Sequence, residues 1–129
     1  MDKATRQLVE YARYHRDPRN IATHFIGIPL IVFGIAALLA RVPLGAAGAW
    51  LPGAQWMVWA LATLWYLRLG RASLTGVTVL TLALLVALAG GLRDAPASVW
   101  LFWGLGSFVV GWVFQAVGHV WEGRKPAFF

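Results

Sequence analysis

Charged residues in this sequence gather at a few points and leave long apolar stretches between them. Four stretches hold no Asp, Glu, Lys or Arg: residues 20–40, 42–67, 72–92 and 95–121. A helix needs about 20 mainly apolar residues to cross the hydrocarbon core of a bilayer, and each stretch is long enough to supply them. The pattern predicts an all-α integral membrane protein with about four transmembrane helices.

Proline, glycine and charged residues give approximate limits to these helices. Within a single membrane domain, 1–129, we expect spans at about 21–40, 54–67, 74–89 and 98–120. The second span is short at these limits, unless Trp50 and Leu51 extend it. Pro29 should kink the first span, because proline removes a backbone donor and clashes with the preceding turn.

Residues 1–19 are polar and charged, which is unlike a cleavable signal peptide. From Asp2 to Arg16 the sequence predicts a helix with Leu8, Ala12 and His15 on one face. A short basic amphipathic helix before a span typically lies in the membrane interface. The pair Asp17-Pro18 should end this helix and begin the next, since Asp is a good N-cap and Pro suits the first helical position.

Composition agrees with this class of protein. Apolar residues make up 60% of the chain and charged residues 12%, against roughly 25% charged in a typical soluble domain. The net charge of +6 belongs to residues at the ends of spans, where lipid headgroups rather than nucleic acid are the expected partners. The absence of cysteine excludes disulfides, thiol chemistry and iron–sulfur clusters.

The basic residues also predict the orientation. With four spans, both termini and the turn around residue 70 lie on one side of the membrane. Nine basic residues fall on that side: Lys3, Arg6, Arg13, Arg16, Arg19, Arg68, Arg71, Arg124 and Lys125. Only Arg41 and Arg93 fall on the other. Positive residues favour the cytoplasm, so both termini should be cytoplasmic. The Ala-, Gly- and Arg-rich usage favours a bacterial plasma membrane; a eukaryotic source would indicate the endoplasmic reticulum.

All three histidines of the chain, His15, His24 and His119, fall on the predicted cytoplasmic side. Stripes of small residues, which let membrane helices approach closely, run along the first and fourth spans. The stripes are Asn20, His24, Gly27, Ile31, Gly34 and Leu38, and Gly104, Ser107, Gly111, Gln115, Gly118 and Glu122. Packing them together should bring His24 close to His119 and Glu122, and the break at Pro18 should let the first helix fold back and add His15.

Two interpretations of these residues stay open. Three imidazoles and a carboxylate can bind Fe, Zn, Cu or Ni, and Fe(II) oxygenases use such a set with open positions. Histidines near span ends can also simply anchor at the headgroups. Glu122 is expected to orient a ligating histidine before it is considered a ligand. Asn20 is expected to start or cap a helix. The remaining basic residues nearby primarily set orientation, and one of them could bind a substrate carboxylate: Arg16, Arg19, Arg124 and Lys125.

Other classes of protein compete with a metal enzyme. His24 and His119 on facing helices could be axial ligands of a haem electron-transfer protein. A small transporter or channel would need an ionisable residue within a span, and none of the four uncharged stretches holds an Asp, Glu, Lys or Arg. A structural membrane protein, with the histidines as anchors, is the third alternative.

Two sequence blocks resemble one known family. The first is YARYHRDPRNIATHFIGIP, residues 11–29, and the second is GHVWEGRKPA, residues 118–127. Both resemble membrane 2-hydroxy fatty acid dioxygenases, a family once catalogued as a domain of unknown function, whose fungal member acts in phytosphingosine breakdown. The segments between the blocks match only in hydropathy.

The resemblance implies a function and a site. It implies an Fe(II)-dependent enzyme that shortens a 2-hydroxy fatty acid by one carbon with molecular oxygen as cosubstrate. His15, His24 and His119 would be the iron-site histidines, with Asn20 and Glu122 as their companions. Members of that family usually continue beyond Lys-Pro-Ala with another apolar segment, whereas this sequence stops at Phe129.

Overall fold

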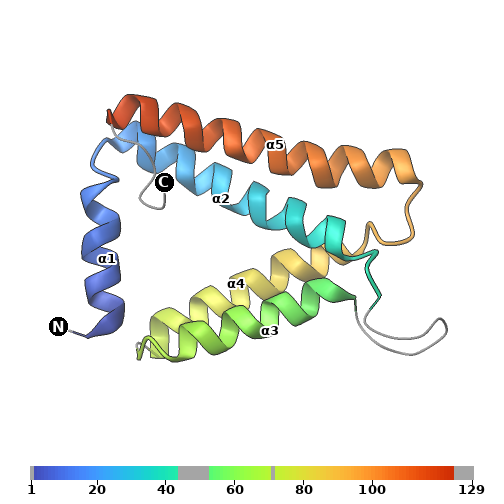
Figure 1. The fold of residues 1–129 in the computed structure, drawn as a ribbon, viewed down its shortest axis with the longest axis horizontal. Helices are drawn as coiled ribbons and strands as arrows, with labels where there is room; N and C mark the ends of the chain where they lie inside the picture. Colours follow the sequence, from blue (N-terminus) through green and yellow to red (C-terminus); the bar gives the residue numbers. More distant parts are fainter. Residues whose placement is uncertain (1, 44–52, 71, 124–129) are drawn as a thin grey trace.

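The computed structural model describes residues 2–43, 53–70 and 72–123, and the ribbon in Figure 1 shows them as an all-helical protein. These residues form five helices: α1 (Lys3–Arg13), α2 (Pro18–Leu39), α3 (Ala54–Leu67), α4 (Ala72–Gly90) and α5 (Ala97–Glu122). The all-α prediction is confirmed, and each of the four predicted apolar segments holds one helix.

Two pairs of helices and one crossing helix make up the fold (Figure 1). Helices α2 and α5 run side by side, and α3 and α4 form a second pair below them. The two pairs converge at one end of the molecule. At the other end they diverge, and α1 crosses the gap between them.

Glycines allow α2 and α5 to pack at close range. A Cβ atom built on Gly34 would lie 2.6 Å from the carbonyl oxygen of Gly104, and one built on Gly111 would lie 2.7 Å from that of Gly27. Both separations are too short for any side chain, so the backbones themselves are in contact, as small residues permit in membrane helix pairs. The predicted packing of the two small-residue stripes is confirmed.

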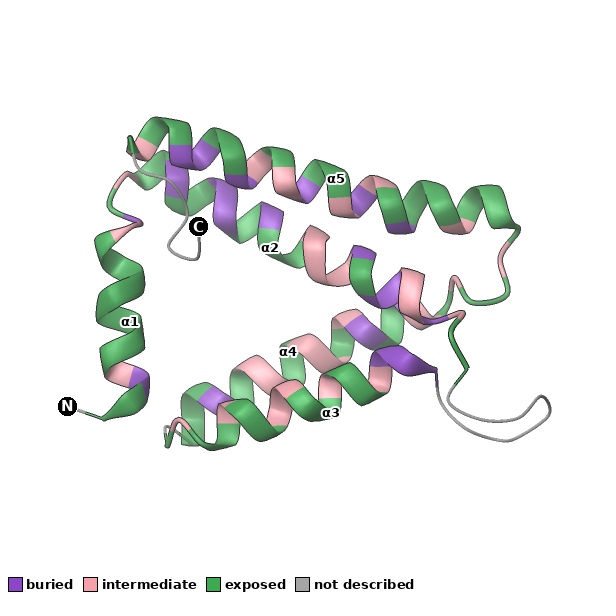
Figure 2. Ribbon diagram, viewed as in Figure 1, coloured by how far each residue is buried: buried purple, intermediate pink, exposed green. Residues whose placement is uncertain are grey.

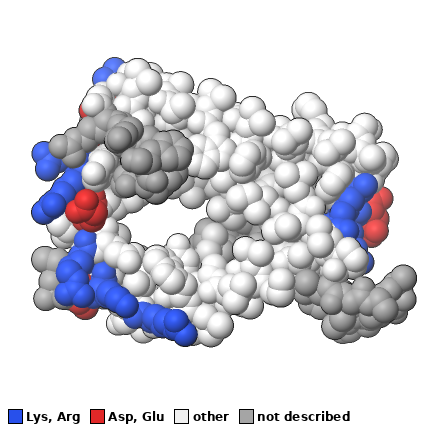
Figure 3. All heavy atoms as spheres, in the orientation of Figure 1, with Lys and Arg blue, Asp and Glu red and all other residues white. Residues whose placement is uncertain are grey.

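Buried residues are mostly small or polar, and the exterior is apolar (Figure 2). The core between the helix pairs consists of Ala36, Ala37, Val86 and Ala89. Large apolar side chains instead face outward; Phe25, for example, is 78% exposed. An exterior of this kind suits hydrocarbon rather than water. Lys and Arg side chains lie at the two ends of the molecule and leave an uncharged band between them (Figure 3).

Three helices, α2, α4 and α5, are long and apolar enough to cross a membrane. Helix α3 has 14 residues and is about 21 Å long at 1.5 Å per residue, which is shorter than the hydrocarbon core of about 30 Å. Trp50 and Leu51, which were expected to lengthen this span if they belong to it, lie outside the described residues. The structure therefore supports three spans by length.

The connection from α1 to α2 differs from the prediction in one respect. Helix α1 ends at Arg13 rather than Arg16, and residues 14–17 link it to α2. In this linker the backbone N–H groups of Arg16 and Asp17 donate to the carboxylate of Glu122 rather than to carbonyl groups of α1. Asp17 is the N-cap of α2 and Pro18 its first residue, as predicted.

Candidate metal centre

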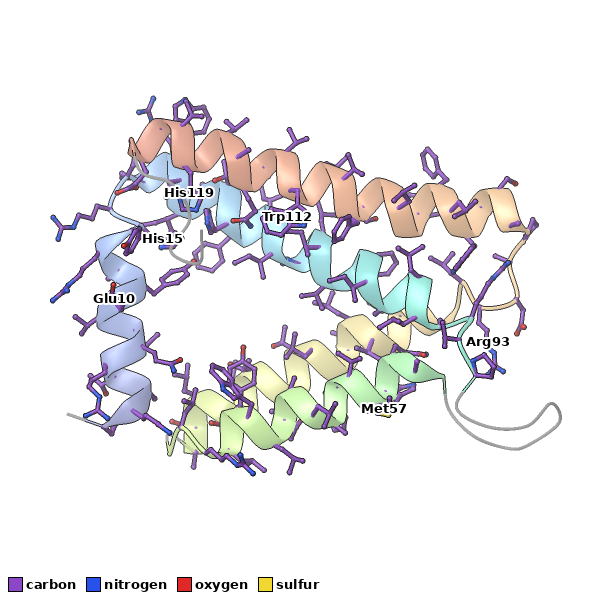
Figure 4. All side chains as sticks on the ribbon, viewed as in Figure 1. Glu10, His15, Met57, Arg93, Trp112 and His119 are labelled. Atoms are coloured by element: carbon purple, nitrogen blue, oxygen red, sulfur yellow. The ribbon has the colours of Figure 1, made fainter. Side chains whose placement is uncertain are left out.

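Three separate elements bring the histidines together. His15 lies in the linker after α1, His24 in the second turn of α2, and His119 in the last turn of α5. Figure 4 shows His15 and His119 side by side where the end of α1 meets the ends of α2 and α5. All three side chains are buried, and one ring nitrogen of each lies within 4.8 Å of the others. The expected convergence of the histidines is confirmed.

Backbone carbonyls fix the protonation of two of the rings. The Nδ1 atom of His15 lies 2.6 Å from the carbonyl oxygen of Tyr11, and that of His24 lies 2.9 Å from the carbonyl oxygen of Asn20. A carbonyl oxygen only accepts, so we assign the proton to Nδ1 in both rings, which leaves a lone pair on each Nε2.

The two Nε2 atoms then lie 3.0 Å apart. Two lone pairs cannot form a hydrogen bond with each other, whereas a shared cation would bind both. Two imidazole nitrogens on one ion, each about 2.0–2.1 Å away, are separated by at most about 4.2 Å, and this pair falls within that limit. A set of neutral imidazoles suits Fe, Zn, Cu or Ni better than Mg or Ca, which prefer oxygen ligands. The side chains present therefore fit a transition-metal ion.

A bis-histidine haem fits this geometry poorly. The rings of His24 and His119 are in edge-to-face contact, with centroids 4.9 Å apart. Axial ligands lie on opposite faces of a porphyrin, so the macrocycle would have to pass between two rings that already touch. The backbones of α2 and α5 are also in contact below them, which prevents the rings from separating without moving the helices.

Glu122 was expected to orient a ligating histidine, and it contacts the backbone next to His15. Its carboxylate accepts the backbone N–H groups of Arg16 at 2.7 Å and Asp17 at 2.6 Å, and the side-chain amide of Asn20 at 3.2 Å. Its described hydrogen bonds therefore go to the linker and to α2 rather than to a histidine ring. Because that linker carries His15, Glu122 positions the histidine through the backbone.

Asn20, in the first turn of α2, links this helix to the linker after α1 and to α5. Its side chain is fully buried, and its amide donates to the carbonyl oxygen of Tyr14 as well as to Glu122. Its own backbone carbonyl accepts from His24. A Cβ atom on Gly118 would collide with the Asn20 side chain, so glycine at that position makes room for it. Asn20 lies at the start of α2, as expected, but Asp17 is the residue that caps the helix.

Tyr11 contacts the histidine cluster, which the sequence did not lead us to expect. Its ring stacks on that of His15, with centroids 3.7 Å apart and an angle of 7° between the planes. Burial raises the pKa of the Tyr11 hydroxyl. The available signal was the spacing of four residues between Tyr11 and His15, which places two rings on one face at the end of a helix.

Two of the four basic residues proposed to bind a substrate carboxylate, Arg16 and Arg19, lie within the described part of the chain. Arg19 binds the carboxylate of Asp17 at 3.0 Å and lies over the ring of Trp121 at 5.0 Å. The side-chain hydrogen bond from Arg19 lowers the pKa of the Asp17 carboxyl, which keeps the cap of α2 charged. Arg16 has an exposed side chain close in sequence to His15. Arg124 and Lys125 lie outside the described residues.

Fold and site together define a helical membrane-type protein with a buried cluster of three histidines able to bind a metal. Comparison with known proteins gives the particular family: the chain belongs to the 2-hydroxy-palmitic acid dioxygenase Mpo1-like family, whose model matches residues 1–129. It is similar to the 2-hydroxy-palmitic acid dioxygenase MPO1 of Saccharomyces cerevisiae, with 34% identity over 122 residues. The match covers 94% of this chain and 66% of the yeast protein. No solved structure matches the chain. The family predicted from the two motif blocks is confirmed.

Proposed function

We propose that this protein is an Fe(II)-dependent dioxygenase that shortens 2-hydroxy fatty acids by one carbon, with molecular oxygen as cosubstrate. The family and the name of the yeast relative support this substrate class and reaction. The observation that carries the proposal is the convergence of His15, His24 and His119, with the Nε2 atoms of His15 and His24 directed at each other and freed by their Nδ1 contacts.

In this proposal the three histidines hold the iron, which supplies activation of oxygen and binding of the 2-hydroxy-carboxylate. The carbonyls of Tyr11 and Asn20 keep the rings of His15 and His24 in the tautomer that binds metal. Glu122 holds the linker and therefore His15. Cations would offset the charge of the substrate carboxylate; the candidates are Arg16 and Arg19, together with Arg124 and Lys125 from outside the described residues.

The proposal also includes a membrane arrangement. Helices α2, α3, α4 and α5 would be the four spans, and α1 would lie in the cytoplasmic interface beside the histidines. Support comes from the direction of α1, which crosses the ends of the other helices, and from the Lys and Arg side chains gathered at that same end (Figure 3). A fatty acid in a bilayer keeps its carboxylate in the interface, at the depth proposed for the histidines, and its chain in the hydrocarbon. The membrane would be the plasma membrane in a bacterium or the endoplasmic reticulum in a eukaryote.

Metal analysis and an activity assay on the purified protein in detergent test the proposal together. We expect bound iron and conversion of 2-hydroxyhexadecanoic acid to a product one carbon shorter, with consumption of oxygen. His15→Ala, His24→Ala and His119→Ala should each lose most of the metal and the activity while remaining folded. Thr81→Ala, on the exposed face of α4, is the control and should lose neither. Stoichiometric metal in the His119→Ala protein, or an iron-loaded protein without turnover, would contradict the proposal.

A further inference from the structure

Helix α2 and the α3/α4 pair are inclined to each other and form a wedge (Figure 1). The helices converge at the end away from the histidines, and α1 closes the wide end (Figure 1). The space-filling view shows an opening through the molecule at this place (Figure 3). The histidines border the wide end of the wedge, because His15 follows α1 and His24 belongs to α2.

Two cavities lie along this wedge. The first, about 310 Å³ in volume, lies between α1 and the α3/α4 pair and includes Leu8, Tyr11, Tyr66 and Thr78 in its lining. The second, about 240 Å³, lies between α2 and the same pair and includes Tyr66 and Ala62. Both have mainly apolar linings, and Tyr66 lines both of them.

Both cavities lie along one face of α4, and we call this face with its two cavities the track. On α4, Thr75 and Thr78 line the first cavity, and Leu82 and Val86 line the second. Their spacing of three or four residues places all four on one helix face. From Thr75 to Val86 this face is about 17 Å long at 1.5 Å per residue. The track has the dimensions of one long hydrocarbon chain.

Tyr11 connects the track to the histidine cluster. It lines the first cavity, and its ring stacks directly on His15. A chain lying in the cavities would therefore have one end beside the candidate metal centre and the other in the narrow part of the wedge.

We propose that these two cavities bind the hydrocarbon chain of the substrate, with its carboxylate and hydroxyl groups at the histidines, and that the second cavity determines how long a chain is accepted. This inference rests on the proposed function for the identity of the substrate. A fatty acid is the occupant that fits, because it has a single chain and its polar end belongs at the histidines. A short chain would occupy only the first cavity, whereas a long one would pass Tyr66 into the second.

A matched pair of substitutions on α3 tests this division. Ala62 lines the second cavity, whereas Ala60, two residues earlier, is exposed on another face of the same helix. The Ala62→Phe variant should fill the second cavity, and its kcat/KM for 2-hydroxyhexadecanoic acid relative to 2-hydroxyoctanoic acid should fall by at least about tenfold. Ala60→Phe should leave this ratio unchanged, and both variants should bind metal as the wild type does. Equal ratios in the two variants would overturn the inference.

Photolabelling tests the location without requiring turnover or a variant that folds. The probe is a 2-hydroxy fatty acid with a diazirine at the end of a long chain, added to the wild-type protein in phosphatidylcholine vesicles. Label should appear on the inner faces of α3 and α4, around Ala62 and Leu82, and unlabelled 2-hydroxyhexadecanoic acid should displace it. Label confined to the outward residues Leu64, Leu80 and Leu84 would overturn the inference. Inner-face labelling without turnover would support the chain site while contradicting the proposed reaction.

Discussion

The carboxylate of Glu122 accepts the backbone N–H of Asp17 at 2.6 Å, which ties the last turn of α5 to the residue that caps α2. The two residues are 105 positions apart in the sequence. The same carboxylate accepts the N–H of Arg16, the residue directly after His15. One side chain at the end of the chain's last described helix thus fixes the linker that presents a histidine from the beginning of the chain.

Removal of this carboxylate should weaken metal binding without abolishing it. In Glu122→Ala the linker loses both hydrogen bonds and His15 is free to move, while His24 and His119 stay on their helices. We expect metal affinity to fall by about 10–100-fold, the usual effect of losing a group that orients a ligand. Titration with Fe(II) or Zn(II) would measure this. Glu10→Ala, which removes an exposed carboxylate on α1, should bind as the wild type does. A loss in Glu122→Ala as complete as that of a histidine variant would instead indicate that Glu122 is a ligand.

Glycine 34 should be intolerant of any side chain. Its Cβ position lies 2.6 Å from the carbonyl oxygen of Gly104, so Gly34→Ala must push α2 and α5 apart, and we expect a loss of about 1–3 kcal/mol in the free energy of unfolding. Gly106→Ala is the matched control, because a Cβ there meets no atom within 4 Å and should change stability by less than about 1 kcal/mol. Unfolding in detergent would compare the two variants. Equal stability would contradict the close packing of the helices.

Reporter fusions would test the orientation of the four proposed spans. Fusions at residue 129 and within the α3–α4 turn after Gly70 should report the cytoplasm, because nine of the eleven Lys and Arg residues fall in the segments that four spans place on the same side as these positions. A fusion at Gly91, in the turn after α4, should report the opposite side. Signals from the same side at Gly91 and at residue 129 would contradict four spans, because α5 between them would then fail to cross the membrane. A cytoplasmic signal at Gly91 with the opposite signal at residue 129 would also contradict them, because it is the result expected if α3 fails to cross.

Acid should release the metal. Imidazole binds a metal only when neutral, and the ordinary histidine pKa is about 6.5, so protons compete increasingly as the pH falls below that value. The amount of metal retained after dialysis should therefore decrease as the pH is lowered through this value. It should recover when the pH is raised again. Far-ultraviolet circular dichroism would show that the helices persist during the release. Retention that is independent of pH across this range would argue against histidine ligands.

The sequence by itself determined the apolar helices and the close packing of α2 against α5. Long uncharged stretches predict apolar helices because the requirement is local: a segment either has enough apolar residues to bury its backbone in hydrocarbon or it does not. The stripes around Gly27 and Gly111 likewise predicted which faces meet, since only small residues allow backbones to touch. The meeting of His24 with His119 followed from the same stripes, and the break at Pro18 correctly predicted that His15 would join them.

The tertiary structure alone decided the partners of individual polar groups and the spaces between helices. Glu122 was within reach of a histidine by sequence, but it binds the N–H groups of Arg16 and Asp17, because the linker leaves α1 early and presents unpaired donors to it. The Nδ1 contacts of His15 and His24 depend on ring rotations that no spacing specifies. The cavities along Tyr66 exist because α3 and α4 diverge from α2, and the angle between helix pairs depends on all the side chains packed where they converge. Local pattern fixes which segments are helices and which faces can meet, whereas these angles and hydrogen-bond choices are set by the simultaneous packing of the whole chain.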